Sequence, residues 1–488
     1  MLPGDDPRVI AGGLVAGTEG EERMQVAPVF AAPLIERYDR PGPRYTSYPS
    51  AREFHAGFGA AQLAEHAQRG SARPGARGLS LYVHVPYCAS PCFYCACTRL
   101  ITRDTSKGPP YVERLLREVA LAAPLLARDR EVVQLHLGGG TPNFLSEATL
   151  AQLLDGLAKA FRLSDSPQRD FSIELDPRSV SAGYAESLVK LGFNRVSLGV
   201  QDFDPRVQRA VNRMQSVAET LDLIDACRDS GVRSVNVDLI YGLPRQTLER
   251  FRHTLRLVMS ARPERLAVYG YAHLPGLFKA QRRIEAAELP RAAERLELLR
   301  LAIEELSAGG YRYIGMDHFA LPDDELVRAQ EAGTLQRNFM GYTTHADCDL
   351  LGIGVSAISH VGESFSQNYR DLKSWEAAVD AGRLPVWRGL ALSADDRVRA
   401  RVIGQLMCQG EIDIGAIERN HGIEFAAYFA DAFARLRPLA ADGLVVIEPG
   451  RITATPAGRL LLRAVAMCFD AYLEPPQDAT APAFSRVV

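Results

Sequence analysis

The stretch YVHVPYCASPCFYCAC, residues 82–97, holds four of the chain's eight cysteines. Cys88, Cys92 and Cys95 are spaced by four and three residues after a strand-like run, so that three thiolates can reach three corners of an iron–sulfur cube. Structural zinc favours two separated pairs of ligands, and a redox dithiol needs only one pair. Cys97 follows Cys95 too closely to reach the fourth corner comfortably. The spacing predicts a [4Fe–4S] cluster with one iron open to a small ligand.

The composition is that of an ordinary globular chain. Its 488 residues include 56 basic and 59 acidic side chains, a formal charge of −3 that excludes binding of polyanions by bulk attraction. No apolar run approaches the ~20 residues that span a bilayer, and the N-terminus lacks the basic start of a secretory signal. We expect a cytoplasmic protein without membrane or nucleic-acid partners, whose cysteines are thiols or metal ligands.

Apolar strand-like runs alternate with amphipathic helical segments from residue 79 onward. The runs are LSLYVHV (79–85), VVQLHLGGG (132–140), FSIELDP (171–177), RVSLGVQDF (195–203), SVNVDLIYGLP (234–244) and RLAVYGYAHLP (265–275). This alternation predicts an α/β fold with a parallel sheet, closed or partly closed into a barrel. Segments 311–321 and 349–359 would add two strands or close the opening.

A polar or glycine-rich feature follows each of these six strands, at the end where barrels carry their active sites. The glycines of 138–140 allow a close approach of backbone to a ligand, although a tight turn explains them equally. Glu174 suits a ribose diol or a structural salt bridge. Gln201 and Asp238, with Arg213 downstream, could together line a second polar pocket, but each alone could equally be structural.

The pattern changes after about residue 390. Helical segments surround a predicted β-hairpin at 443–455, which suggests a winged-helix-like module. Residues 391–475 contain 11 acidic residues against nine arginines and no lysine, which disfavours a role in reading nucleic acid. We expect five parts: an irregular extension (1–36), an arm that covers the substrate (37–78), the barrel (79–375), a helical, winged-helix-like domain (376–475) and a loose tail (476–488).

CX3CX2C after the first strand of a β/α barrel is the signature of the radical S-adenosylmethionine (SAM) superfamily. Over about nine-tenths of its length the chain resembles the oxygen-independent coproporphyrinogen III oxidase (coproporphyrinogen dehydrogenase) family. The resemblance is carried by stretches that include RYDRPGPRYTSYP (37–49), residues 82–97, LGGGTPNFL (137–145) and GFNRVSLGVQDFDPRVQRAVNR (192–213). It implies a partial (β/α)6 TIM-like barrel with an N-terminal arm and a mostly helical C-terminal domain.

The resemblance also implies site residues. Cys88, Cys92 and Cys95 would hold the cluster, while Cys97 would not. Of two SAM molecules, the first would contact Tyr82, Gly139, Glu174 and Ile358. The second would contact Tyr94, Gly140, Thr141, Gln201, Arg213, Asp238 and Ala272, with Tyr94 standing where phenylalanine is expected. Cys97 and Arg44 are the candidate catalytic residues, Arg44 as a partner for a substrate carboxylate.

The implied reaction converts coproporphyrinogen III to protoporphyrinogen IX in heme biosynthesis. A 5′-deoxyadenosyl radical would remove hydrogen from the β-carbon of a propionate, and loss of CO2 would leave a vinyl group, twice per substrate. A small donor such as flavodoxin or ferredoxin and an unknown acceptor would exchange electrons with a monomeric enzyme. The alternative is a radical SAM-type heme chaperone. Chaperones share CX3CX2C, but they carry an aromatic residue at the position of Cys97 and lack the PGPRYTSYP arm (41–49).

Overall fold

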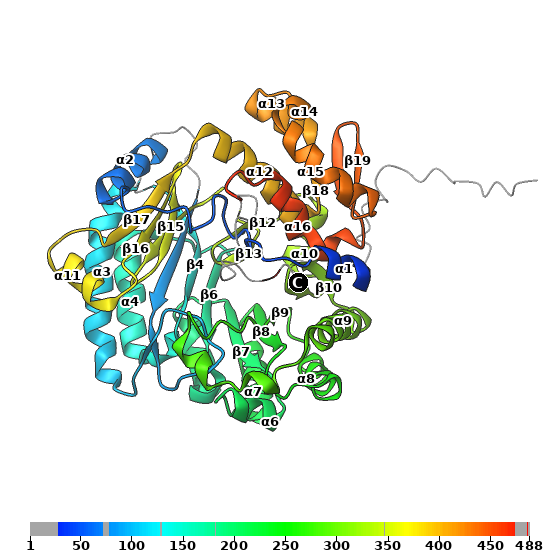
Figure 1. Ribbon diagram of the computed structural model, residues 1–488. Helices are drawn as coiled ribbons and strands as arrows, with labels where there is room; N and C mark the ends of the chain where they lie inside the picture. Colours follow the sequence, from blue (N-terminus) through cyan, green and yellow to red (C-terminus); the bar gives the residue numbers. More distant parts are fainter. Residues whose placement is uncertain are drawn as a thin grey trace, which may run out of the picture.

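The computed structural model describes residues 28–71, 78–126, 129–180, 182–345, 347–473 and 486. A 13-stranded sheet forms its centre (Figure 1). Six neighbouring strands are parallel: β9 (Arg265–Gly270), β8 (Ser234–Tyr241), β7 (Arg195–Gln201), β6 (Asp170–Leu175), β4 (Glu131–Gly139) and β1 (Leu79–Val85). These are the six predicted runs, and the predicted parallel sheet is confirmed. Nearly continuous burial along β1 and β8 explains why these runs are apolar throughout.

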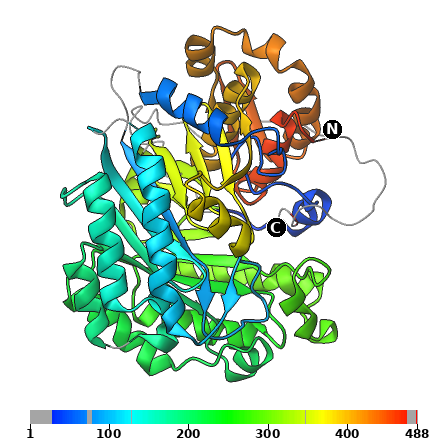
Figure 2. The ribbon, with the colours of Figure 1, turned by 90° about the vertical axis from the view of Figure 1, so that its left-hand side faces the viewer.

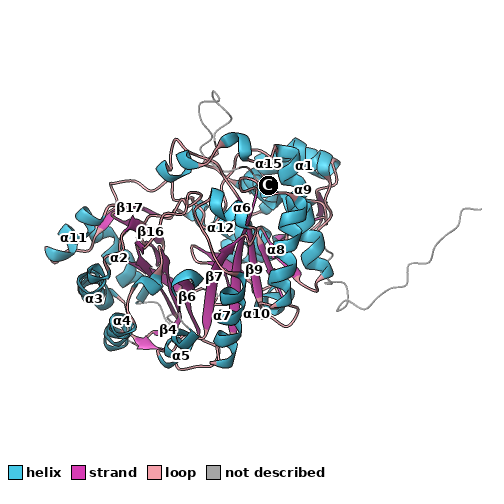
Figure 3. Cartoon of the chain, turned by 90° about the horizontal axis from the view of Figure 1, so that it is seen from below, coloured by secondary structure: helices cyan, strands magenta, loops and turns pink. Residues whose placement is uncertain are grey.

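Helices connect the parallel strands and cover the outer side of the sheet, as Figure 3 shows. They are α3 (Gly108–Ala122), α4 (Glu147–Ala160), α5 (Ala182–Lys190), α7 (Val217–Asp229) and α8 (Leu248–Ser260); the short α6 (Pro205–Ala210) precedes α7, and α9 (Ala292–Ala308) follows β9. The side chains of Ser146, Ser216 and Thr247 each accept a backbone N–H of the first turn that follows them. These caps fix where α4, α7 and α8 begin.

The two additional strand-like segments lie on opposite sides of the six parallel strands. Segment 311–321 forms a hairpin, β10 (Arg312–Gly315) and β11 (His318–Ala320), which pairs antiparallel with β9. Segment 349–359 supplies β14 (Asp349–Ile353), parallel to β1. The sheet then continues antiparallel through β15 (Ile358–Val361), β16 (Ser364–Asn368) and β17 (Val386–Ala391), so that β17 lies beyond residue 375, the expected end of the barrel. The strand path ends at β10 and β17, and within the described part of the chain the barrel is therefore open.

The C-terminal part is helical with a small sheet, as predicted. Its helices are α12 (Ala394–Gln409), α13 (Ile414–His421), α14 (Phe425–Tyr428), α15 (Ala430–Ala441) and α16 (Leu462–Ala466). The predicted hairpin is β19 (Val445–Glu448) and β20 (Arg451–Ala454), to which β18 (Glu411–Asp413) adds a third strand. The remaining elements are β2 (Tyr87–Cys88), β3 (Leu100–Ile101), β5 (Arg162–Leu163), β12 (Gln336–Asn338), β13 (Gly341–Thr343), α10 (Glu325–Glu331) and α11 (Leu372–Asp380). No helix in the described ranges combines the length and apolarity needed to cross a membrane.

The arm lies against the C-terminal domain (Figure 2, blue beside orange and red). The chain enters the arm through α1 (Ala32–Tyr38), a helix whose first five residues belong to the extension (1–36) that we expected to be irregular; a proline in its first turn favours a helix start. The arm ends with α2 (Ala60–Ser71). Between them, the Tyr45 hydroxyl donates to Asp470 at 2.9 Å and the Tyr48 hydroxyl accepts the N–H of Ala471 at 3.0 Å. The rest of the expected extension (1–27) and the expected tail, apart from Arg486, lie outside the described residues.

Candidate functional site

The cysteine loop connects two short paired strands next to the end of β1. Cys88 closes β2, and Cys92, Cys95 and Cys97 follow before β3 begins. The guanidinium of Arg99 donates to the carbonyls of Cys95 at 2.9 Å and Cys92 at 3.1 Å. These hydrogen bonds join the end of the loop to its middle, so that Arg99, which the sequence did not single out, fixes the shape of the cysteine segment.

Polar and basic side chains surround the thiols. The hydroxyl of Thr141 donates to Cys88 Sγ at 3.4 Å, and Arg213 and Arg178 approach Cys92 Sγ at 3.5 and 3.8 Å. Burial raises the pKa of the Cys88 thiol to about 11, so this thiol becomes a thiolate only with a positive partner such as a metal. The donor set, three thiols with basic neighbours that offset their charge, fits an iron–sulfur cluster.

Cys97 differs from the other three cysteines. Cys97 is exposed, and its backbone N–H donates to Cys95 Sγ at 3.4 Å. The Cys97 side chain also donates to Cys95, which lowers the pKa of the Cys95 thiol. No three His, Cys, Asp or Glu side chains in the described ranges converge closely enough to hold a single metal ion. A [4Fe–4S] cluster does not need such close convergence, because each of its thiolate ligands binds a different iron at a separate corner of the cube.

The predicted contacts of the first SAM gather at the ends of β1, β4 and β6. Glu174 accepts the backbone N–H of Gly139 at 3.2 Å and contacts His136 Nε2 at 3.2 Å. The ring of Tyr82 stacks on that of His136, with centroids 5.9 Å apart. Gly139 has a φ of 106°, and a Cβ there would lie 2.4 Å from the His84 ring, so only glycine fits. Burial alone would raise the pKa of Glu174, but its hydrogen bonds outweigh that effect and the pKa is lowered.

Ile358 comes from the other side of β1. Its backbone lies so close to Gly352 on β14 that a Cβ on Gly352 would meet the Ile358 carbonyl at 2.4 Å. Gly352 in turn pairs with Tyr82 in the sheet. The four residues predicted for the first SAM therefore lie on β6, β4, β1 and β15, with only β14 between β1 and β15.

The residues predicted for the second SAM lie on both sides of the cysteine loop. The N–H of Gly140 donates to the Val85 carbonyl at 2.8 Å, which places Thr141 over Cys88. Across the loop, the buried amide of Gln281 donates to the carbonyls of Tyr94 at 2.9 Å and Ala272 at 3.2 Å. Gln281, which the sequence did not indicate, thus joins two of the predicted residues.

Of the other three predicted residues, Gln201 ends β7, Arg213 follows it and Asp238 lies on β8. Arg213 is buried and pairs with Asp176 at 3.4 Å, in addition to its contact with Cys92. Gln201 has a φ of 69°, a conformation that non-glycine residues rarely adopt and that is concentrated at functional sites. Asp238 accepts hydrogen bonds from Ser197 at 3.1 Å and Asn236 at 2.9 Å, and burial raises its pKa to about 6.

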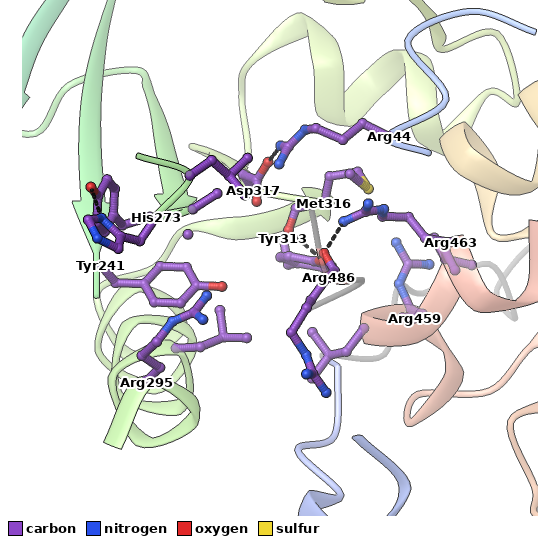
Figure 4. A pocket seen from close by; sticks show the side chains of 17 residues that line it. Arg44, Tyr241, His273, Arg295, Tyr313, Met316, Asp317, Arg459, Arg463 and Arg486 are labelled. Carbon is purple, nitrogen blue, oxygen red and sulfur yellow. Dashed lines mark hydrogen bonds and ion pairs between the residues drawn. The ribbon is translucent and has the colours of Figure 1, made fainter. Parts of the chain in front are cut away.

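A cavity of about 270 Å³ lies beside the ends of β8 and β9, where Tyr271 and Ala272 contribute to its lining (Figure 4). Asp317 is the one carboxylate among its described lining residues, and Arg44 forms an ion pair with it. Five arginines line the cavity: Arg44, Arg295, Arg459, Arg463 and Arg486. Of these, the sequence indicated only Arg44, because the others belong to no local motif.

Known proteins are similar to this chain over nearly its whole length. The model of the radical SAM superfamily matches residues 82–258, and that of the HemN C-terminal domain matches residues 392–461. The oxygen-independent coproporphyrinogen III oxidase of Pseudomonas aeruginosa is 50% identical, covering 94% of this chain and 98% of the relative. The enzyme of the same name from Salmonella typhimurium is 47% identical, covering 93% and 98%.

A solved structure resembles the whole fold. It is the coproporphyrinogen III oxidase (HemN) from Escherichia coli, described as a radical SAM enzyme. It superposes with a TM-score of 0.87 at 44% identity and covers 92% of this chain and 100% of that one. The resemblance noted in the sequence is thereby confirmed over nearly the whole length. This chain belongs to the oxygen-independent coproporphyrinogen III oxidase family of the radical SAM superfamily.

Proposed function

We propose that this protein converts coproporphyrinogen III to protoporphyrinogen IX without oxygen. Each of two propionate groups would lose one hydrogen atom, one electron and CO2, and become a vinyl group. The observation that carries the proposal is the near-complete match to oxidases of this name, together with a cysteine loop set among basic side chains.

We assign the [4Fe–4S] cluster to Cys88, Cys92 and Cys95. When bound, the reduced cluster and SAM supply the carbon radical that removes hydrogen from the substrate. The chain's own contribution is positioning: Arg99 shapes the loop, and the basic neighbours Arg178 and Arg213 offset the thiolate charge.

We further propose two SAM sites. Glu174 is placed to accept ribose hydroxyls, and Gly139 allows the backbone to approach the methionyl group, beside Tyr82 and Ile358. The second site is proposed at Tyr94, Gly140, Thr141, Gln201, Arg213, Asp238 and Ala272. The ion pair of Arg213 with Asp176 supports an orienting role for this arginine in preference to a free anion-binding one.

Cys97 and Arg44 remain the proposed catalytic residues. The Cys97 thiol hydrogen-bonds to Cys95 and interacts electrostatically with Glu174. Both contacts support a position of Cys97 between the proposed cluster and the proposed SAM site. Arg44 lines the cavity at the end of β9 and is held there by Asp317. Its guanidinium is suited to bidentate pairing with a propionate.

The proposed reaction fixes the kinds of partner. An electron donor of low potential, such as flavodoxin or ferredoxin, would reduce the cluster, and a second carrier would accept one electron per vinyl group formed. We propose that the enzyme works as a monomer in the cytoplasm. Its cysteine content supports the latter, because unpaired thiols and a cluster suit a reducing compartment.

A comparison of turnover with heme binding tests the proposal against the heme-chaperone alternative. The protein, reconstituted with iron and sulfide without oxygen, is incubated with SAM, dithionite and coproporphyrinogen III, and the tetrapyrroles are analysed for vinyl groups. We expect monovinyl and then divinyl product, with no stoichiometric heme complex after heme addition. Tight one-to-one heme binding without decarboxylation would establish the chaperone instead.

A further inference from the structure

The charges around the cavity at the ends of β8 and β9 are unbalanced. Five arginines and one aspartate line it among the described residues. Uncompensated guanidinium groups at a partly enclosed site favour the arrival of an anion, because desolvation without a partner is costly. Which arginines are available follows from the partners that each one has.

Three of the five arginines are already engaged. Arg44 pairs with Asp317, and Arg486 pairs with Asp39 at 2.7 Å. Arg463, 3% exposed, donates to the backbone carbonyls of Pro43 and Arg486, at 2.9 and 2.6 Å. Arg463 thereby joins the arm to residue 486 over the cavity, which is a positioning role.

Arg295 reaches the cavity from the first turns of α9. Its Nε is buried and has no hydrogen-bond partner within the described ranges of the chain. The side chain lies against β8's end, since a Cβ on Gly242 would be 3.2 Å from this nitrogen. In Figure 4 it lies beside Tyr241 at one side of the cavity.

Arg459 reaches the cavity from the C-terminal domain, in the 3-10 turn Gly458–Leu461. Its side chain makes no hydrogen bond or ion pair with any residue that the structure describes, although it is largely buried and lies near Tyr313 and Tyr342. Figure 4 shows it next to Arg463, across the cavity from Arg295. Two guanidinium groups that have no carboxylate partner among the described residues thus come from opposite walls of the cavity.

We infer that Arg295 and Arg459 bind propionate carboxylates of the tetrapyrrole substrate, an inference that rests on the proposed function. Both guanidiniums offer the paired N–H groups that carboxylates accept. The cavity, at about 270 Å³, is below the ~300–1,000 Å³ that encloses a drug-sized ligand, so it takes one propionate-bearing edge of the macrocycle. Tyr271 and Ala272 also line the cavity, and Ala272 belongs to the proposed second SAM site. The bound edge of the macrocycle would therefore lie next to the strand ends where the radical reaction is proposed.

The carboxylate of SAM has the same chemistry as a propionate, so the test measures both ligands. Coproporphyrin III, the fluorescent oxidised form with the same four propionates, is titrated into cluster-loaded wild type, Arg295→Ala, Arg459→Ala and Arg459→Lys. SAM binding is measured by equilibrium dialysis. Arg437→Ala is the matched control, because Arg437 is exposed in the same C-terminal domain, on α15. Visible absorbance and circular dichroism confirm that each variant is folded and loaded.

We expect each alanine variant to bind coproporphyrin III about tenfold to a hundredfold more weakly, the effect of losing a charge-assisted hydrogen bond. Arg459→Lys should lie between, the control should match wild type, and SAM binding should stay unchanged. The tetramethyl ester of coproporphyrin III should bind weakly and equally to all variants.

Unchanged coproporphyrin III affinity in both alanine variants would overturn the inference, as would a loss confined to SAM binding. Turnover separates this outcome from failure of the proposed function. If wild type forms vinyl product and the variants keep its KM, only the assignment of these two arginines is wrong. If wild type neither binds coproporphyrin III nor forms product, the proposed function fails as well.

Discussion

The carboxylate of Glu174, on β6, accepts a hydrogen bond from the backbone N–H of Gly139, on β4, over 3.2 Å. Two features that the sequence placed at separate strand ends are therefore one structural unit. The hydrogen bond aligns the carboxylate with a backbone segment that has no room for a Cβ. This carboxylate is the group that we propose accepts the ribose hydroxyls of SAM.

Glu174→Gln removes the negative charge but keeps the shape of the side chain. We expect SAM to bind about tenfold more weakly, because a hydrogen bond to a charged acceptor contributes about 1.5–3 kcal/mol. Equilibrium dialysis under argon measures this, with Glu113→Gln as the control, since Glu113 is exposed on α3. Wild-type SAM affinity in Glu174→Gln would remove this residue from the proposed site, while cluster absorbance should not change in either variant.

The four cysteines of residues 82–97 should divide into three cluster ligands and one, Cys97, that does not ligate the cluster. Cys97→Ala is expected to keep the visible absorbance of the cluster, because its backbone N–H, which donates to Cys95 Sγ, remains in place. Cys95→Ala should lose that absorbance, since three thiolates are required. Measuring bound iron and sulfide after reconstitution gives the cluster content of each variant quantitatively. Loss of the cluster in Cys97→Ala would show that the fourth cysteine is a ligand after all.

Asp238 should make stability depend on pH. Burial raises its pKa to about 6, whereas an unfolded aspartate titrates near ~3.9. The folded protein therefore binds this proton more tightly than the unfolded chain does. The contribution of this proton to the free energy of unfolding is fully present below about pH 4 and is lost as the pH rises through 6. Asp238→Asn carries no such titration. Its unfolding free energy relative to wild type should rise by about 1–2 kcal/mol from pH 5 to pH 8.

Urea unfolding of both proteins under argon, followed by circular dichroism at several pH values, gives that difference. A difference in unfolding free energy that stays constant across this pH range would mean that Asp238 is ionised throughout. Its hydrogen bonds from Ser197 and Asn236 would then outweigh the effect of burial on its pKa.

Arg463 should hold the arm in place. Arg463→Gln removes buried hydrogen bonds to the backbone of the arm and of residue 486, and we expect a loss of stability on the order of 3 kcal/mol. Limited proteolysis should then cut the arm near residues 41–50 sooner than in wild type. Arg451→Gln, which loses only an exposed ion pair with Glu411, is the control and should change stability by less than about 1 kcal/mol. Equal effects of the two substitutions would argue against this role.

The parallel strands and the cysteine loop were predictable from sequence because each is specified locally. A strand buried on both faces must be apolar almost throughout, and the three cysteines of the CX3CX2C pattern lie within one short loop. The helix caps and the hairpin at 445–454 likewise depend on neighbouring residues.

The remainder depends on contacts between distant parts of the chain. β14 pairs with β1 although 270 residues separate Leu79 from Asp349, and nothing local to either strand specifies that partner. The cavity combines Arg44, Arg295 and Arg459 from the arm, the barrel and the C-terminal domain. The family resemblance implied that arginines pair with substrate carboxylates, but only the tertiary structure shows which arginines have no carboxylate partner among the described residues.

The stoichiometry of a single anaerobic turnover experiment tests the central claim most directly. Cluster-loaded protein is incubated with SAM, dithionite and coproporphyrinogen III, and 5′-deoxyadenosine, CO2 and protoporphyrinogen IX are quantified together. We predict about two deoxyadenosines and two CO2 for each protoporphyrinogen, and none of the three products with Cys88→Ala. Vinyl product from Cys88→Ala, or deoxyadenosine without CO2 from the wild type, would contradict the account.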